Sequence, residues 1–358
     1  MDSVGRRTRA PYFDDLATTK ASGYATDVIA VRSKDDAKVF ATDFNARFTG
    51  RAARASSRGG TVDVLIDGEI HFTMVLGESG VCRFREGGLQ ADPAMLGSVK
   101  GLREIIGPHS LRFEYRYTSS NNDYRLAFIE SFFWVWDSSD NVIVSDVDGT
   151  ITRSDVGGMI NGVLGARMGW KKGHAHPGVC QLYNELLNRT GARMLYLTAR
   201  PLSFINETRS YLYELEQSFG PSGTPMRLPS GAIVTDTTTV TSSFRREVVD
   251  KSSHVFKTRM LLQLRDCFFR AGRDVRRYPV FLATFGNKGT DVEAYLAAGA
   301  PPVTVFVIDT SSMIQVAKEF RMRMESYGDP RLISLLLERV ELIKTGRLPD
   351  PNFPIEHC

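Results

Sequence analysis

The sequence lacks any apolar run long enough to span a membrane, and it lacks a strong charge of either sign. Its 358 residues include 45 lysines and arginines and 41 aspartates and glutamates, for a net charge of +4. That excess is too small to indicate nucleic-acid binding by itself. A bilayer span needs roughly 20 apolar residues, so we expect no transmembrane helix. Segment 1–10 is basic but no apolar stretch follows it, which argues against a secretory leader.

Cysteine is scarce and shows no pattern. Cys82, Cys180, Cys267 and Cys358 form no CxxC pair and have no histidines at zinc-ligand spacing, so a zinc site and a secreted disulfide framework are both disfavoured. A chain of this length can bury large cores without such crosslinks. We therefore expect a cytoplasmic protein of about two domains, at roughly 150 residues per domain.

The first third of the chain has the pattern of a β-sandwich. Short alternating runs such as 61–66 and 70–76 are joined by turn residues, here Asp67-Gly68, which is a strong hairpin signal. Regularly spaced short strands are typical of sandwiches. Segment 85–107 is rich in glycine and has no periodicity, so we interpret it as a loop. We place the sandwich at residues 22–138.

From about residue 140 onward, buried strands alternate with helices. This rhythm predicts an α/β domain with a Rossmann-type parallel sheet covered on both faces, whose ligand site lies at the carboxyl ends of the strands. We place this domain at 139–328. A basic terminus at 1–21 and the sandwich precede it, and a terminal helix and tail at 329–358 follow it. The expected strands are 142–145, 194–197, 280–283 and 303–308. The expected helices are 176–190, 203–217, 241–250, 254–270, 290–298, 312–326 and 330–345.

The most informative segment is an acidic strand end. Asp146 and Asp148 follow an apolar strand and precede Gly149 and Thr150. One carboxylate there can attack phosphorus and form an aspartyl-phosphate, and the other can protonate the leaving oxygen and then activate water. Gly149 and Thr150 would let backbone N–H groups approach phosphate oxygens. The alternative is an ordinary acidic turn, because aspartate and glycine are common turn residues.

Three further blocks support the phosphate chemistry. Thr198 and the neighbouring amide of Ala199 follow a strand and could bind phosphate, although a helix N-cap explains a threonine there equally well. Asn287 or Asp291 follows another strand and could give an oxygen to Mg²⁺, which prefers oxygen ligands. Lys257 could neutralise the phosphate and the nucleophile, although a lone lysine is usually solvated surface.

These four blocks, in this order, resemble the haloacid-dehalogenase superfamily of phosphotransferases, and the aspartate at 148 indicates a phosphatase or phosphomutase. A closer resemblance is to the lipins, Mg²⁺-dependent phosphatidate phosphatases. It extends over roughly residues 22–310 and rests on several blocks: Asp27-Val-Ile-Ala-Val-Arg32, Met74-Val-Leu-Gly77, Trp134-Val-Trp-Asp137, His176-Pro-Gly178, Leu197-Thr-Ala-Arg200, Leu228-Pro-Ser-Gly231 and Phe256-Lys257.

The resemblance implies a haloacid-dehalogenase-like catalytic domain and an immunoglobulin-like β-sandwich. It implies an enzyme that hydrolyses phosphatidic acid to diacylglycerol and phosphate at membrane surfaces, with no nucleic-acid partner. The implied location is cytoplasmic and peripheral, at the endoplasmic reticulum or nuclear envelope.

The resemblance also assigns roles to the site residues. Asp146 would be the nucleophile and Asp148 the general acid and base, with Thr198 and Lys257 completing the phosphate site. The implied Mg²⁺ ligands are the Asp146 carboxylate, the Asp148 main-chain carbonyl and Asn287, with Asp291 close by.

The sequence departs from lipins in three places. Only segment 85–107 is available for the long charged insert of animal lipins, and their coactivator motif is replaced by Val156-Gly-Gly-Met-Ile160, which lacks its leucines. Pro11 would interrupt a membrane-inserting helix, so segment 1–21 is either disordered or held at a membrane by its charge. The basic candidates for docking are Arg6, Arg7, Arg9, Lys171, Lys172, Arg245 and Arg246.

Two alternatives stay open. The first keeps the chemistry and changes the substrate to soluble phosphometabolites. The second is a non-catalytic module that binds membranes or partners and has kept the fold. The intact set of Asp146, Asp148, Thr198, Lys257 and Asn287 argues against the second alternative.

Overall fold

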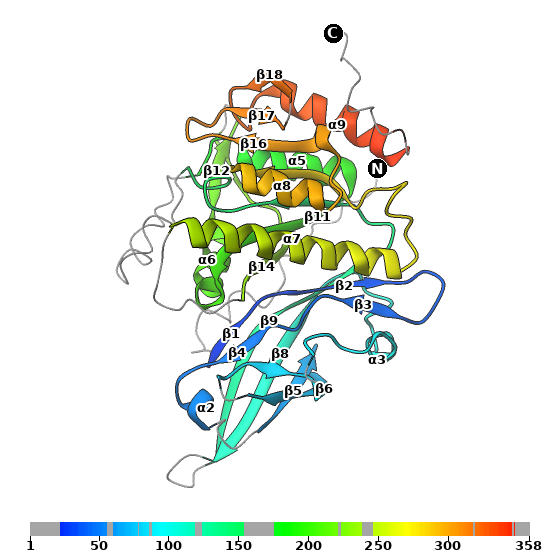
Figure 1. Cartoon of the computed structure of the whole chain (residues 1–358), viewed down its shortest axis with the longest axis vertical. Coiled ribbons are helices and arrows are strands. Elements are labelled where there is room, and N and C mark those ends of the chain that lie inside the picture. Colours follow the sequence, from blue (N-terminus) through cyan, green and yellow to red (C-terminus); the bar gives the residue numbers. More distant parts are fainter. Residues whose placement is uncertain are drawn as a thin grey trace. The chain divides into compact units, whose positions relative to one another are not determined.

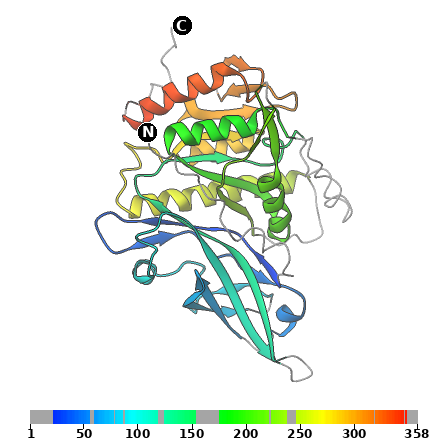
Figure 2. The same cartoon turned by 180° about the vertical axis from the view of Figure 1, so that it is seen from behind.

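The chain forms two compact units, drawn from opposite sides in Figures 1 and 2. The computed structural model describes residues 22–55, 60–77, 79–85, 88–118, 124–153, 175–220, 223–237, 246–317, 319–345 and 347. The first unit takes in the chain up to Arg32 and Ala37–Val135, and the second takes in Ser33–Asp36 and the chain from Trp136 onward. Within the described residues, no helix has the length and apolar character needed to cross a bilayer.

The first unit is built around a seven-stranded sheet with the order β3-β2-β9-β8-β5-β6-β7. Its strands are β2 (Val28–Arg32), β3 (Val39–Ala41), β5 (Gly60–Ile66), β6 (Glu69–Leu76), β7 (Cys82–Arg83), β8 (Gly107–Thr118) and β9 (Tyr124–Asp137). The predicted hairpin joins β5 to β6, with φ of 51° at Asp67 and 85° at Gly68. Positive φ at both positions is what a type I′ turn requires. The long strands β8 and β9 pair with each other, and their outer neighbours are β5 and β2.

A second, two-stranded sheet of β1 (Gly23–Ala25) and β4 (Ala46–Phe48) completes this core. The N–H of Phe48 donates to the Gly80 carbonyl at 2.8 Å, and the N–H of Ser22 donates to the Phe128 carbonyl of β9 at 2.9 Å. Both sheets contribute buried side chains to one hydrophobic cluster. The arrangement is therefore one large sheet with a small one, which does not by itself establish the predicted sandwich.

Two short helices also belong to the first unit, α2 (Gly50–Ala55) and α3 (Pro93–Ser98). Helix α3 lies in segment 85–107, which we interpreted as a loop, so that interpretation was wrong in part. The Asp92 carboxylate accepts from the N–H groups of Ala94 and Met95 at 2.8 and 3.0 Å, and Pro93 occupies the first turn. Aspartate before proline is a helix-start signal, and it was present in the sequence.

The second unit contains the α/β sheet that the sequence predicts, with the order β14-β11-β10-β15-β16-β17-β18. The first five strands are parallel to their neighbours, and the last two are antiparallel additions. The strands are β10 (Val142–Ser145), β11 (Arg193–Pro201), β14 (Ala232–Asp236), β15 (Phe281–Gly286), β16 (Val305–Ile308), β17 (Ile314–Val316) and β18 (Glu319–Met324). Strands β10, β14 and β15 are buried at every position, as expected for a sheet covered on both faces.

Helices cover both faces of this sheet. Figures 1 and 2 show α7 and α8 on one face and α5 and α9 on the other. The helices are α5 (Val179–Thr190), α6 (Ile205–Glu214), α7 (Arg246–Arg270), α8 (Gly289–Ala297) and α9 (Pro330–Lys344), with short 3₁₀ turns η3 (Leu202–Phe204) and η4 (Pro302–Thr304). The two helices expected over 241–250 and 254–270 are one helix from Arg246, and residues 241–245 lie outside the described part. A small hairpin, β12 (Glu216–Phe219) with β13 (Thr224–Arg227), was not predicted.

The helix predicted over 312–326 is wrong, because this segment forms β17 and β18. The turn before β17 is held by Asp309, whose carboxylate accepts from the N–H groups of Ser311 and Met313 at 2.8 and 3.0 Å. Ser312 in that turn has φ of 77°. In β17 the side chains alternate between buried and half-buried, which is the two-residue period of a strand.

Candidate active site

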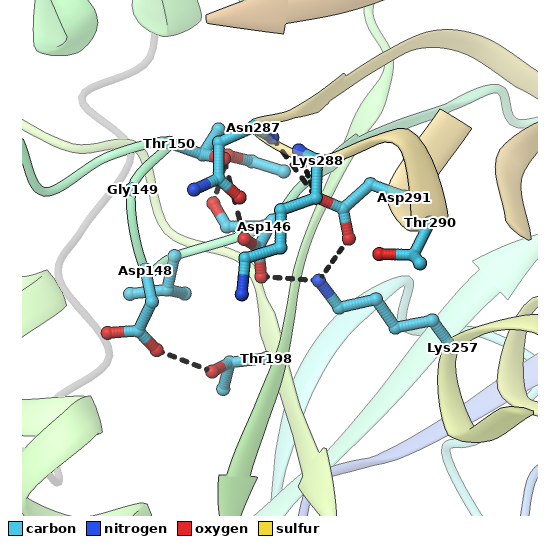
Figure 3. A network of polar contacts seen from close by, with 12 residues as sticks. Asp146, Asp148, Gly149, Thr150, Thr198, Lys257, Asn287, Lys288, Thr290 and Asp291 are labelled. Atoms are coloured by element: carbon cyan, nitrogen blue, oxygen red, sulfur yellow. Dashed lines mark hydrogen bonds and ion pairs between the residues drawn. The ribbon is translucent and has the colours of Figure 1, made fainter. Parts of the chain in front are cut away.

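The predicted site residues come together at the carboxyl edge of the parallel sheet (Figure 3). Asp146 and Asp148 follow β10, Thr198 ends the regular part of β11, and Asn287 follows β15. These strands are neighbours and parallel, so their carboxyl ends meet at one edge. Lys257 reaches the same place from α7, and Asp291 from the first turn of α8.

The Lys257 ammonium lies between two buried carboxylates. It donates to Asp146 Oδ1 and to Asp291 Oδ1, each at 2.7 Å. The side chains of all three residues are at most 6% exposed. The alternative reading of Lys257 as solvated surface is therefore wrong. One ammonium facing two carboxylates leaves an excess negative charge in a site that water hardly reaches.

This charge distribution shifts the proton affinities of the three groups. Burial raises the pKa of Asp146 to about 7 against the opposing effect of Lys257, and the carboxylates of Asp291 and Asp148 add to the rise. Burial also disfavours ionised Asp291, but Lys257 and two backbone N–H groups outweigh it and hold that pKa below its usual value. The pKa of Lys257 is raised, because its two carboxylate partners outweigh the effect of burial. The single positive charge of Lys257 therefore does not fully compensate the negative charge of Asp146.

Asp146 is held in place by groups on three sides. Its N–H donates to the Phe285 carbonyl of β15 at 2.9 Å. Ser145 Oγ donates to the Asp146 carbonyl at 2.7 Å and lies 2.8 Å from the hydroxyl of Tyr183 in α5. The Thr150 hydroxyl donates to Asp146 Oδ2 at 3.4 Å. A carboxylate fixed in this way is ready to attack without rearrangement.

The turn after Asp148 has a shape that needs glycine. Gly149 has φ of +78°, and a Cβ there would lie 1.9 Å from Asn287 Nδ2. Its N–H donates to the Thr152 hydroxyl at 3.0 Å, so this group is engaged inside the turn. Phosphate binding by Gly149, Thr150 and Ala199 stays a prediction.

His176 supports the same turn and was not among the predicted site residues. It is fully buried, with Nε2 at 3.2 Å from the Gly149 carbonyl and Nδ1 at 2.8 Å from the Ser312 hydroxyl. Burial lowers the pKa of His176. A neutral ring that donates from Nε2 and accepts at Nδ1 satisfies both partners. The histidine therefore connects the turn after β16 to the turn that contains Gly149.

Asp148 is paired with an arginine that sequence reasoning missed. Arg200 Nε donates to Asp148 Oδ2 at 2.8 Å and to Oδ1 at 3.1 Å, and Arg200 Nη2 also donates to Oδ1. Thr198 Oγ1 lies 3.2 Å from Asp148 Oδ2. Thr198 and Arg200 are two residues apart in β11, so their side chains project to the same side.

The oxygens around Asn287 fit a hard cation. In the orientation that satisfies its hydrogen bonds, the Asn287 amide nitrogen donates to the Asp148 main-chain carbonyl at 3.3 Å and to Asp291 Oδ2 at 3.2 Å. In the opposite orientation the amide oxygen faces these two oxygens with no hydrogen between them. Either the amide turns over and donates, or a cation lies among the oxygens. Within the described ranges, no three histidine, cysteine, aspartate or glutamate side chains are grouped to hold a metal. The available donors are carboxylate, carbonyl and amide oxygens, which is the chemistry that Mg²⁺ prefers.

Several predicted features lie outside the described residues. These are the basic docking candidates Arg6, Arg7, Arg9, Lys171, Lys172 and Arg245, the side chain of Arg246, and segment 156–160. Their proposed roles stay predictions.

Comparisons with known proteins show the family to which the chain is similar. The family model described as LNS2 (Lipin/Ned1/Smp2) matches residues 102–333, which include every residue of the candidate site. Phosphatidic acid phosphohydrolase 1 of Saccharomyces cerevisiae is 32% identical over 222 residues, or 61% of this chain and 23% of that protein. Phosphatidate phosphatase LPIN2 of Mus musculus is 35% identical over 176 residues, or 49% of this chain and 18% of that protein.

A plant relative is similar to this chain over a part of comparable length. Phosphatidate phosphatase PAH1 of Arabidopsis thaliana is 31% identical over 226 residues, which is 62% of this chain and 23% of that protein. In each of these three comparisons the match spans less than a quarter of the relative's length.

Proposed function

The chain belongs to the Lipin/Ned1/Smp2 family, and on that premise we propose that it is a Mg²⁺-dependent phosphatidate phosphatase. It would hydrolyse phosphatidic acid to diacylglycerol and phosphate. The observation that carries the proposal is the buried Asp146–Lys257–Asp291 triad at the end of β10, next to Asp148. A carboxylate fixed beside an ammonium, with a second carboxylate at the same strand end, is suited to phosphoryl transfer through the enzyme itself.

The reaction has two steps. In the first, an Asp146 carboxylate oxygen forms a bond to phosphorus, and the bond between phosphorus and the glycerol oxygen breaks. Asp148 gives a proton to that oxygen, which leaves as the hydroxyl of diacylglycerol. In the second, Asp148 takes a proton from water, and the water oxygen forms a bond to phosphorus. The bond between the Asp146 oxygen and phosphorus breaks, which restores the Asp146 carboxylate and frees inorganic phosphate. Lys257, held at 2.7 Å from Asp146, balances negative charge in both steps.

The metal site would use residues that already face one another. The Asp146 carboxylate, the Asp148 carbonyl and the Asn287 amide oxygen would hold Mg²⁺. Asp291 keeps its place beside it, because its Oδ2 accepts from the N–H groups of Asn287 and Lys288 at 3.0 and 3.1 Å. When bound, Mg²⁺ supplies charge neutralisation for the nucleophile and the phosphate oxygens. The excess negative charge around Lys257 supports this assignment.

We extend the proposal to the first unit and to the location. The first unit would be the immunoglobulin-like β-sandwich of lipins, supported by two sheets that share one core and by a family match that starts inside this unit, at residue 102. Phosphatidic acid is a bilayer lipid, so the enzyme would be cytoplasmic and peripheral, at the endoplasmic reticulum or nuclear envelope. Basic residues would attract it to anionic lipid.

The test measures phosphate release from phosphatidic acid in mixed phosphatidylcholine vesicles, with Mg²⁺ and with a chelator in its place. Glycerol 3-phosphate, which has the same phosphomonoester without acyl chains, is the soluble comparison, and Asp146→Asn is the control protein. Mg²⁺-dependent release from vesicles alone supports the proposal. Faster release from the soluble ester supports the metabolite phosphatase, and no release from either supports the non-catalytic module.

A further inference from the structure

The carboxylate of Asp148 is bound mainly by one buried arginine, Arg200. Arg200 contacts both of its oxygens, whereas Thr198 contacts one. The Arg200 side chain is only 5% exposed. Asp148 itself lies in the turn beyond the end of β10. Its backbone is therefore not part of the sheet, and its orientation depends on side-chain contacts.

The guanidinium is anchored at its other end. Arg200 Nη1 lies 3.4 Å from the Thr208 hydroxyl, and that hydroxyl donates to the Phe204 carbonyl at 2.8 Å. Phe204 precedes α6 and Thr208 lies in its first turn. A continuous chain of contacts therefore runs from the start of α6 through Arg200 to Asp148. A planar guanidinium that is held on both sides gives a carboxylate one orientation rather than many.

We propose that Arg200 is the positioning residue for Asp148 in the phosphatase reaction. Arg200 directs the carboxylate of Asp148 to the side of the site marked by Thr198, from which Asp148 reaches the oxygen that leaves and the water that attacks. Figure 3 shows Asp148 pointing toward Thr198, while Asp146 points toward Lys257. The two carboxylates are thus kept in separate roles by separate cations. This inference rests on the proposed function.

The same strand offers a matched control. Arg193, the first residue of β11, binds Asp140 through Nε at 2.8 Å and Nη2 at 3.2 Å. Arg193 and Asp140 form a pair joined through two guanidinium nitrogens, as Arg200 and Asp148 do, but at the opposite end of the strand from the site. Arg193→Gln removes such a pair without touching the catalytic turn.

The experiment compares Arg200→Gln, Arg200→Lys and Arg193→Gln, with Mg²⁺ saturating, on phosphatidate vesicles and on p-nitrophenyl phosphate. Phosphatidate needs a proton for its leaving oxygen, but p-nitrophenolate leaves without one. Because misplacement by about 1 Å costs roughly 10²-fold, we expect Arg200→Gln to lower kcat on phosphatidate by about that factor, with KM within about twofold. The initial burst of p-nitrophenol should keep its rate within about threefold. Arg200→Lys should recover part of the loss, and Arg193→Gln should keep full activity.

A double-mutant comparison separates positioning from general damage. In the Asp148→Asn background, Arg200→Gln should cause less than about a twofold further loss, since its effect passes through Asp148. Losses that multiply, a slowed burst or a change in KM alone would overturn the inference. If Arg200→Gln does not fold by circular dichroism, Thr208→Val, which removes only the anchor of the guanidinium, takes its place and should show a smaller loss of the same kind. Wild-type turnover in Asp148→Asn alone would instead refute the proposed mechanism.

Discussion

The two ends of the parallel sheet in the second unit both hold paired arginines and aspartates, but they differ in charge balance. At the amino end, Arg193 pairs with Asp140, and Arg273 donates to the carbonyls of Tyr278 and Pro279 at 2.8 and 2.7 Å and to that of Asp140. Burial lowers the pKa of Arg273 to about 10, although Asp140 opposes that shift. The two guanidinium groups of Arg193 and Arg273 therefore share one carboxylate, that of Asp140, and these three groups carry an excess of positive charge.

The carboxyl end has the opposite character. Lys257 is shared between Asp146 and Asp291, so two carboxylates face one ammonium. The amino end borders a cavity of about 430 Å³ lined by Lys34, Arg273, Tyr278 and Lys344 among others. The difference teaches that an excess of buried negative charge marks the candidate site at one end of this sheet, whereas the cavity lies at the other end.

The largest expected effect is on turnover, and it is tested by replacing one aspartate at each end of the sheet with asparagine. Asp146→Asn should abolish turnover, because an amide cannot attack phosphorus. Asp140→Asn should keep kcat and lower the free energy of unfolding by about 1.5–3 kcal/mol, the usual contribution of a hydrogen bond to a charged group. Phosphate release and chemical denaturation measure the two effects. Measurable turnover by folded Asp146→Asn would break the comparison.

A smaller loss is expected for the second catalytic carboxylate. Asp148→Asn should slow phosphatidate hydrolysis by roughly 10²–10⁴-fold, the usual effect of a positioned acid and base. The measurement is the steady-state rate on vesicles, with thermal unfolding as the check on folding. A loss below about threefold would remove Asp148 from the mechanism.

Two glycines with positive φ, one at each end of the sheet, allow a sharper test. Gly149→Ala places a Cβ 1.9 Å from Asn287 Nδ2, whereas Gly191→Ala, at φ of +69°, meets nothing within 4 Å. Both changes carry backbone strain of about 1–2 kcal/mol. Only Gly149→Ala should also raise the Mg²⁺ concentration needed for half-maximal activity, since only it displaces Asn287. Equal Mg²⁺ dependence in the two variants would show that Asn287 is not a ligand.

The smallest expected effect is on stability against pH. His176 has a lowered pKa in the folded state, so the unfolded chain binds more protons between that value and about 6.5. The stabilising contribution is therefore present above about pH 6.5 and is lost as the pH falls toward the folded pKa. Denaturation curves from pH 7.5 to 5 should show this loss in the wild type and less of it in His176→Gln. An identical pH slope in both proteins would contradict the assignment.

The sequence was most informative about the site where polar side chains come directly after a strand. Asp146, Asp148, Thr198 and Asn287 could be placed together because the carboxyl ends of neighbouring parallel strands must meet. Lys257 could be named as a candidate, but its place in the site rested on the resemblance, because periodicity does not say which side of a long helix faces a site 111 residues away in sequence.

The parts that sequence missed have particular physical causes. Arg200 could have been found, since it is two residues after Thr198 on the same side of a strand. His176 could not, because its contacts at Gly149 and Ser312 depend on the packing of three separate segments. The hairpin of β12 and β13 is largely exposed and polar, so it has no alternation for a pattern to detect.

The strand order of the first unit has a consequence for fragments of this protein. The family match begins at residue 102, just before β8 and β9, which have 12 and 14 residues. In the intact unit their outer edges pair with β5 and β2, both of which precede residue 102. A polypeptide cut to 102–333 would therefore carry a long two-stranded ribbon with both edges open, and open edges of that kind recruit other chains. The span that the family model matches thus lacks the strands that cover both edges of this ribbon, and we expect a fragment trimmed to it to aggregate.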